Sequence, residues 1–274
     1  MKKAIGFSLV ILVIQSLGCA TKGTQSVDAE QYVQGLRSES VRQSRSSGPQ
    51  CPRTSESWSQ ESSWRALVAQ ANACVRSQNW PQVEAIGQHL AQTEPVGPWG
   101  AYYLSLSAEA TQRLPRALWM IDLALKKAPR NSLLTYQMGR VQWAMGDYEK
   151  AMESYQQALR YDSDLMDAHL ALGLIYFRDQ DSAKANHHLS KVLESEPQNF
   201  AALVALGEIQ LERGQREQAQ ELLARAAREN SSDQKLRARL DKLNEELALE
   251  RAQALAASSP RREPSAEGSE KGTP

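Results

Sequence analysis

The sequence predicts an all-α protein, a solenoid of about five stacked helix-turn-helix units closed by a single capping helix. The main observation is a pattern that recurs at a fixed interval, without a gap, from Trp64 to Asp233. A second observation is that small and large residues alternate at fixed offsets within each copy. The period of about 34 residues is typical of helical arrays, whose units bury their apolar faces only by stacking on neighbours.

The register is clearest in residues 166–199. The first predicted helix of this unit carries Leu172 and Gly173, and the second carries Ala185 and Leu189. Repeating the same step in both directions defines five units, 64–97, 98–131, 132–165, 166–199 and 200–233. The first copy is degenerate, because Gly87 stands where a large apolar side chain is expected.

These offsets resemble the tetratricopeptide repeat, in which a Leu-Gly pair and a Tyr on the first helix precede an Ala and a large apolar residue on the second. Gly139, Gly173 and Gly207 lack a β-carbon, so we expect the two helices of a unit to approach closely there. The family's Trp position departs from the pattern, since it holds Leu67, Ala101, Thr135, His169 and Leu203. This departure makes the match to the family's sequence pattern less complete, but it does not change the predicted fold.

Residues 234–257 predict a capping helix. Leu236, Leu240, Leu243 and Leu247 recur at helical spacing among charged residues, so one face is apolar and the other polar. The ends of a stacked array need such a polar outer face. A coiled-coil segment would show a similar stripe over more heptads. Residues 258–274 are rich in Pro, Ser, Gly and charge, and we expect them to be disordered.

Residues 1–18 have the features of a secretory signal peptide. Lys2 and Lys3 precede an apolar run over residues 4–14, and small residues surround the expected exit near Gly18. The apolar run is shorter than the roughly 20 residues that a membrane-spanning helix needs. We therefore expect export and removal of this segment.

Cys19 follows this segment at the expected cleavage site and resembles the lipidated Cys of a bacterial lipobox. The resemblance implies a lipid anchor, and Ala20, in place of Asp, implies sorting to the Gram-negative outer membrane, facing the periplasm. Ser16 departs from the Leu of the lipobox pattern and would also suit ordinary signal peptidase. A soluble periplasmic or secreted protein is therefore the alternative.

Residues 19–63 are polar and Ser-rich, and we expect a flexible linker between the lipidated Cys and the repeats. The linker contains Cys51, and the first repeat contains Cys74. In an oxidising compartment this pair could form a disulfide. Alternatively, Cys74 is a small buried apolar residue of a helix.

Composition and motifs exclude several classes of function. With 32 basic and 32 acidic residues, and no basic stripe, nucleic acid is not an expected partner. HExxH, GxSxG and Gly-rich phosphate-binding motifs are absent from the sequence. His187 and His188 are adjacent on a predicted helix, where side chains point about 100° apart. We therefore expect no enzyme, catalytic residue, metal, cofactor or small-molecule substrate.

The first helix of each unit carries a second face, opposite to the packing face. In the tetratricopeptide family, positions on this face line a concave groove that binds ligands, which implies protein partners here. An exposed apolar strip with Arg has the composition of a binding hot spot. Two alternatives remain open: these side chains pack between neighbouring first helices, or a terminal segment folds back over them. The predicted groove residues are Trp99, Tyr102, Leu106, Tyr136, Arg140, Trp143, Leu170, Leu174, Phe177 and Arg178.

Family members that clamp acidic C-termini use Lys and Asn where this chain has residues such as Tyr102 and Leu174. An apolar partner segment therefore fits the predicted groove better. The sequence favours an adaptor in the cell envelope that assists localisation or assembly of a machine such as a type IV pilus with its secretin, a secretion system or a motility complex. This architecture resembles that of pilotin-type lipoproteins. The alternative is an adaptor that regulates peptidoglycan hydrolases or envelope proteases.

Overall fold

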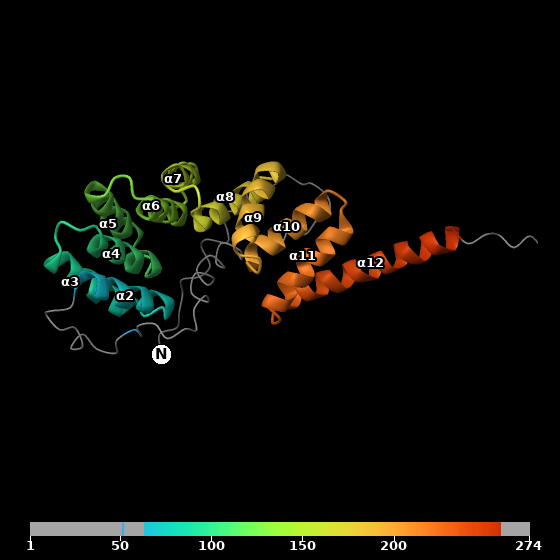
Figure 1. The fold of residues 1–274 in the computed structure, drawn as a ribbon, viewed down its shortest axis with the longest axis horizontal. Helices are drawn as coiled ribbons and strands as arrows, with labels where there is room; N and C mark the ends of the chain where they lie inside the picture. The colour runs from blue at the N-terminus through green and yellow to red at the C-terminus, as the bar shows by residue number, and fades with distance from the viewer. Residues whose placement is uncertain (1–50, 52–62, 259–274) are drawn as a thin grey trace, which may run out of the picture.

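A computed structural model describes Cys51 and residues 63–258. The predicted signal peptide over residues 1–18, Cys19, most of the 19–63 linker and the 259–274 part of the tail lie outside the described residues. The described residues form helices joined by turns (Figure 1). The helices are α2 (Trp64–Arg76), α3 (Trp80–Thr93), α4 (Trp99–Ala110), α5 (Leu114–Lys127), α6 (Ser132–Met145), α7 (Tyr148–Tyr161), α8 (Met166–Arg178), α9 (Ser182–Ser195), α10 (Phe200–Glu212), α11 (Arg216–Glu229) and α12 (Gln234–Ser258).

The predicted fold class is confirmed, because consecutive helices pair into hairpins that stack along the array (Figure 1). We call α2, α4, α6, α8 and α10 the inner helices, and α3, α5, α7, α9 and α11 the outer helices. The outer helices bury one narrow stripe each, as shown by Ala151, Tyr155 and Ala158 of α7. Their remaining faces are polar, so stability comes from the stacked stripe rather than from isolated helices.

Close contact within a hairpin depends on one small position of the inner helix. A β-carbon added to Gly139 would lie 2.7 Å from the ring of Tyr155. A β-carbon on Gly173 would lie 2.7 Å from Leu189, and one on Gly207 would lie 2.6 Å from Leu223. These distances are shorter than ordinary van der Waals contacts, so a larger residue at these positions would force the facing side chain to shift, and glycine allows the close approach that the sequence predicted.

In the hairpin of α4 and α5, the small residue at the close contact is Ser105 in place of glycine. This residue is fully buried, and its hydroxyl donates a hydrogen bond of 3.0 Å to the carbonyl of Ala117. A polar side chain is tolerated in this position because its hydrogen bond is satisfied by the facing outer helix. In the degenerate first unit, a β-carbon on Gly87 would lie 3.1 Å from Leu104, so Gly87 allows α3 to approach α4.

The turns inside the hairpins share one backbone conformation. Five residues, one in each hairpin, have positive φ, between 56° and 88°. In each turn this residue donates its N–H to the carbonyl three residues back, and the next N–H reaches five residues back. This is the Schellman geometry that ends helices with a left-handed residue. The five residues are Gln78, Gln112, Gly146, Gln180 and Gly214.

Short polar side chains fix several helix starts. Asn131 Oδ1 accepts a hydrogen bond of 3.0 Å from the N–H of Leu134 at the start of α6. Asn199 does the same for α10, over 3.1 Å to the N–H of Ala202. These caps satisfy N–H groups that have no partner inside the helix.

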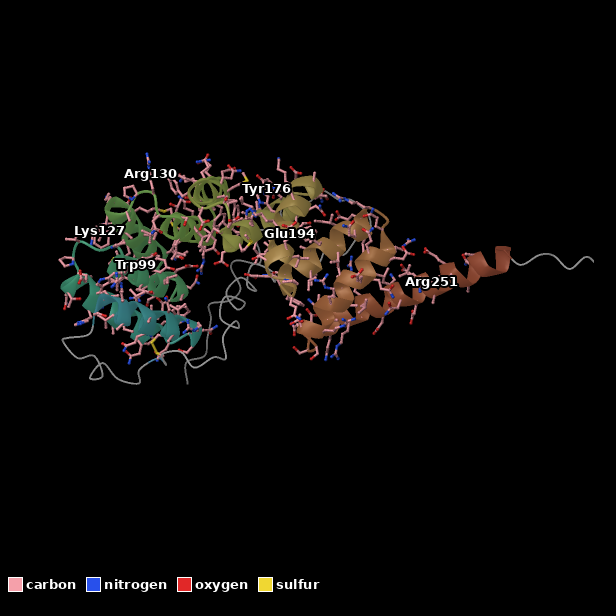
Figure 2. The ribbon with its side chains drawn as sticks, in the orientation of Figure 1. Trp99, Lys127, Arg130, Tyr176, Glu194 and Arg251 are labelled. Carbon is pink, nitrogen blue, oxygen red and sulfur yellow. A yellow bond between two sulfur atoms is a disulfide. The ribbon has the colours of Figure 1, made fainter. Side chains whose placement is uncertain are left out.

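Helix α12 caps the array. Leu236, Leu243 and Leu247 are buried in the same core as Leu203 and Leu223 of the last hairpin. Beyond this contact α12 extends past the repeats, and Arg251 lies on the extended part (Figure 2).

No helix in the described part of the chain is both long enough and apolar enough to cross a membrane.

At the other end of the array, Cys51 and Cys74 are joined by a disulfide, with a Cα–Cα distance of 4.6 Å. Cys74 is fully buried in α2, so the bond attaches Cys51 directly to the first inner helix. The disulfide closes a loop over a sequence separation of 23 residues. In the chain-entropy model, a disulfide that closes a loop of this size stabilises the folded state by about 3 kcal/mol.

We expect the substitution Gln180→Gly to raise the free energy of unfolding by about 0.5 kcal/mol, because glycine adopts positive φ without a steric cost. Chemical denaturation of the variant measures this change. Gln157→Gly in the middle of α7 is the control and should lower stability by about 1 kcal/mol. Equal effects at the two positions would contradict the role given to the turn.

We expect Cys51→Ser to destabilise α2 and α3 by about 3 kcal/mol, because the disulfide no longer restricts the unfolded segment. Amide hydrogen exchange, resolved by helix, measures the loss of protection. Helices α8 to α11 should keep their exchange rates, since they pack on other helices away from this end of the array. Unchanged protection of α2 would show that the disulfide contributes little.

Candidate partner-binding face

The predicted groove residues divide into a buried layer and a partly exposed layer. Five of them are at most 9% exposed, namely Tyr102, Leu106, Tyr136, Leu170 and Leu174. Four are half-buried, namely Trp99, Arg140, Trp143 and Phe177, and Arg178 is exposed. We call the side of the array formed by these positions on α4, α6 and α8, and by the equivalent positions of the repeat on α10, the inner face.

The buried layer packs between neighbouring helices. Tyr102 meets Trp99 of the same helix edge to face, with ring centroids 5.8 Å apart, and it lies in one core with Leu134 of α6. Tyr136 contacts Tyr155 of the outer helix, with ring centroids 5.5 Å apart. Leu170 and Leu174 belong to the core that also contains residues of α10. These side chains therefore stabilise the stacking of the helices. The half-buried residues are the ones that a partner can contact.

An ion pair that the sequence reasoning did not predict crosses the inner face. Glu109 of α4 is 4% exposed, and its Oε1 accepts a hydrogen bond of 2.9 Å from Arg140 of α6. Its Oε2 accepts a second bond, of 2.7 Å, from Gln137 Nε2. Burial disfavours the charged form of Arg140, but Glu109 and the neighbouring Tyr136, Tyr155 and Tyr102 together outweigh burial and raise the Arg140 pKa. The only signal in the sequence was a pair of opposite charges about one repeat apart.

A second cluster lies at the edge of the inner face, where α6 ends. The Arg178 guanidinium lies 4.8 Å from the ring centroids of both Trp143 and Tyr148. The two rings are themselves 4.6 Å apart, and Arg178 also bonds Asp179 at 2.9 Å. Cation–π contacts of this kind link α8 to the preceding hairpin. Trp143 and Tyr148 remain partly exposed, which leaves apolar ring surface for a partner.

Two histidines form a hydrogen-bonded pair between α8 and α9. His169 Nε2 lies 3.0 Å from the carbonyl of Ser163, so this nitrogen carries the proton. His169 Nδ1 is then an acceptor and lies 2.8 Å from Nδ1 of His188, which must donate. The ring of Tyr176 stacks on His188, with ring centroids 5.6 Å apart. The geometry assigns a neutral His169 with a defined tautomer.

The surroundings of this pair disfavour protonation. Burial, together with the nearby His169, His187 and Lys191, lowers the pKa of His188 to about 4. Burial also lowers the pKa of His169, and Lys191 acts in the same direction, while Asp164 opposes it. A proton on His169 Nδ1 would also place two N–H groups head to head. The pair therefore stabilises the fold in its neutral form.

The described residues contain no group of three or more His, Cys, Asp or Glu side chains arranged to hold a metal ion. Among these residues, the unusual polar groups are ion pairs and a histidine pair that join different helices. These contacts stabilise the array and leave the half-buried aromatic residues as the surface available for binding.

Comparison with known proteins agrees with this geometry. Residues 135–180 match a model described as TPR repeat, and residues 176–243 match one described as tetratricopeptide repeat. The fold is an array of tetratricopeptide repeats. This fold is typically a protein-interaction scaffold without enzymatic activity.

Two curated relatives share part of the array. A TPR repeat-containing protein of Methanocaldococcus jannaschii is 32% identical over 94 residues, which is 34% of this chain and 16% of that protein. The BBSome complex member BBS4 of Bos taurus is 31% identical over 78 residues, 28% of this chain and 15% of that protein. The chain thus spans about one sixth of the length of the curated relatives it matches.

Two solved structures share the fold along most of their length. A thermophilic TPR protein of Thermus thermophilus has a TM-score of 0.53 and 19% identity, over 66% of this chain and 98% of that protein. PilW, a widely conserved type IV pilus biogenesis factor, has a TM-score of 0.56 and 18% identity, over 73% of this chain and 95% of that protein. At this identity the similarity concerns the fold alone.

We expect acid to destabilise the protein through the histidine pair. His188 has a folded pKa of about 4 against 6.5 in the unfolded chain, so the unfolded state binds more protons between these values. Stability should therefore fall, by about 2 kcal/mol, as the pH drops from about 6.5 towards 4. Urea denaturation at several pH values measures the slope.

The variant His188→Gln should lose most of this pH dependence, because its amide can still donate to His169 but does not titrate. The variant His89→Gln on α3 is the control and should keep the slope. An unchanged slope in His188→Gln would assign the acid sensitivity to other groups.

Proposed function

We propose that this chain is an exported adaptor that uses its inner face to bind an apolar segment of a partner protein. In this proposal the partner is a component of an envelope machine, and binding assists its localisation or assembly. The repeat fold supports protein partners in general. Binding of an apolar segment at the inner face is supported mainly by three half-buried aromatic residues of the inner helices, Trp99, Trp143 and Phe177.

Aromatic residues and Arg are the types that dominate binding energy in protein interfaces. Trp143 is held in place by Tyr148 and Arg178, so little side-chain freedom is lost when a partner covers it. A segment with large apolar side chains would replace water over these rings. The inner face is therefore suited to hold a short apolar segment rather than to carry out chemistry.

Two features favour the cell envelope as the location. The disulfide between Cys51 and Cys74 is of the kind that persists in oxidising compartments. Residues 1–19 have the pattern of a signal peptide followed by a lipidated Cys. PilW is a type IV pilus biogenesis factor with the same fold, so pilus assembly is the first candidate process to test. We propose an outer-membrane anchor facing the periplasm.

Lipidation is tested directly by the mass of the mature N-terminal peptide. We expect the peptide to begin at Cys19 and to carry a diacylglyceryl group with an additional acyl chain. An unmodified Cys19 at the mature terminus would support a soluble exported protein and would remove the anchor from the proposal. The variant Cys19→Ser should leave the protein out of the membrane fraction.

Partner binding is tested by the variant Trp143→Ala. We expect crosslinking in intact envelopes to recover at least tenfold less of the specific partner, because a central aromatic residue contributes roughly 2 kcal/mol or more to an interface. Trp119→Ala is the matched control, since Trp119 is 61% exposed on the outer helix α5. Circular dichroism checks that both variants fold.

Equal partner recovery by the two variants would contradict binding at the inner face. Recovery of a peptidoglycan hydrolase or an envelope protease as the Trp143-dependent partner would replace assembly by regulation as the function.

A further inference from the structure

The basic side chains of the inner face are already paired. Arg140 is held by Glu109 at 2.9 Å, and Arg178 by Asp179 at 2.9 Å. Arg239 of α12 forms an ion pair with Glu208 of α10. A guanidinium that is held by a carboxylate attracts a second carboxylate much less strongly. The inner face therefore offers little attraction to an acidic segment.

The acidic side chains of the same face are not all paired. Asp167, in the first turn of α8, is exposed and forms no ion pair with any residue that the structure describes. Glu196, whose charge acts on Asp167, accepts a hydrogen bond from the Asn199 amide but has no basic partner among the described residues. Arg140 also acts on Asp167 but is bonded to Glu109. Three carboxylates, including the Glu109 that holds Arg140, and one guanidinium leave a net negative charge at this place.

The pKa of Asp167 reports the same imbalance. Although Asp167 is exposed, the protein atoms around it remove part of the hydration of its carboxylate and raise its pKa, and Glu196 adds to the rise. The attraction of Arg140 opposes the rise without cancelling it. A positive charge placed beside Asp167 by a partner would relieve this cost.

Glu208, further along the array, is incompletely bonded, and so is its partner Arg239, whose Nε is also buried without a hydrogen-bond partner. Glu208 is 6% exposed, and its Oε2 bonds Arg239, but its Oε1 is buried without a hydrogen-bond partner. In the corresponding pair, Gln137 lies three residues before Arg140 and bonds the second oxygen of Glu109. Three residues before Arg239 stands Leu236, whose side chain has no donor.

Glu208 stands at the same place in its repeat as Arg140, so its uncompensated oxygen belongs to the inner face. Burial raises its pKa to about 7, and Glu212 adds to the rise. The carboxylate without a basic partner therefore lies at α8, while at α10 the Glu208–Arg239 pair leaves one acceptor and one donor unsatisfied. A partner that brings a basic side chain can balance the charge of the unpaired carboxylate at α8.

We propose that the inner face selects a partner segment that carries a Lys or Arg beside large apolar residues, with Asp167 as the carboxylate that receives the basic side chain. The inference rests on the proposed function, because it names the chemistry of the segment bound there. The apolar residues cover Trp143 and Phe177, and the basic side chain balances the negative charge at the start of α8. An acidic segment of the same shape is rejected by repulsion.

Three short synthetic peptides test the proposal by fluorescence anisotropy on the purified chain. They share the same Leu and Phe anchors and carry Lys, norleucine or Glu at one central position. We expect the Lys peptide to bind about fivefold more tightly than the norleucine peptide, as for a partly exposed ion pair, and the Glu peptide to bind most weakly. The preference should shrink as salt is added.

The variant Asp167→Asn should bind the Lys and norleucine peptides equally, while Asp122→Asn on the outer helix α5 should keep the preference. Asp122 is paired with Lys126 away from the inner face, so it is a matched control. Binding that ignores peptide charge, or a preference that survives in Asp167→Asn, overturns the inference and leaves the proposed function standing. Failure of all three peptides to bind overturns the proposed function, and the inference with it.

Discussion

The close approach of two helices inside each hairpin is the contact on which the whole array depends. It depends on one small residue per unit, and in three units this residue is a glycine, Gly139, Gly173 or Gly207, that faces a large side chain of the outer helix. Ser105 replaces glycine once, because its hydroxyl is satisfied by the facing carbonyl. Since the contact recurs at the same offset, every hairpin has a similar shape, and similar shapes can stack into one continuous core.

Stacking of similar hairpins has a consequence for binding. Neighbouring inner helices lie close enough to bury Tyr102, Tyr136 and Leu174 between them, so these side chains contribute to cohesion. Only residues near the helix ends or at the outermost part of the face, such as Trp99, Trp143 and Phe177, keep surface for a partner. Recognition therefore depends on a few aromatic rings and on the charges that stand among them.

The candidate face could be predicted from the sequence only in part. Helical periodicity gives the direction in which a side chain leaves its helix, so the ten predicted residues lie at inner-face positions or, for Arg178, beside them. Periodicity does not give the distance to the next helix, which decides whether Tyr136 is exposed or covered. It also does not reveal the bond between Glu109 and Arg140, or the one between His169 and His188, because each joins residues on different helices.

The sequence alone determined the period of the array, the small residues inside each hairpin and the leucine stripe of the capping helix. These features are local, because each depends on residues within one repeat or one helix. The tertiary structure alone decided how far the inner face is covered and which charges neutralise one another. It also decided that Gln78, Gln112 and Gln180 adopt the left-handed turn that glycine adopts elsewhere. The helices on either side impose that conformation, since the geometry of the hairpin outweighs the preference of a single residue.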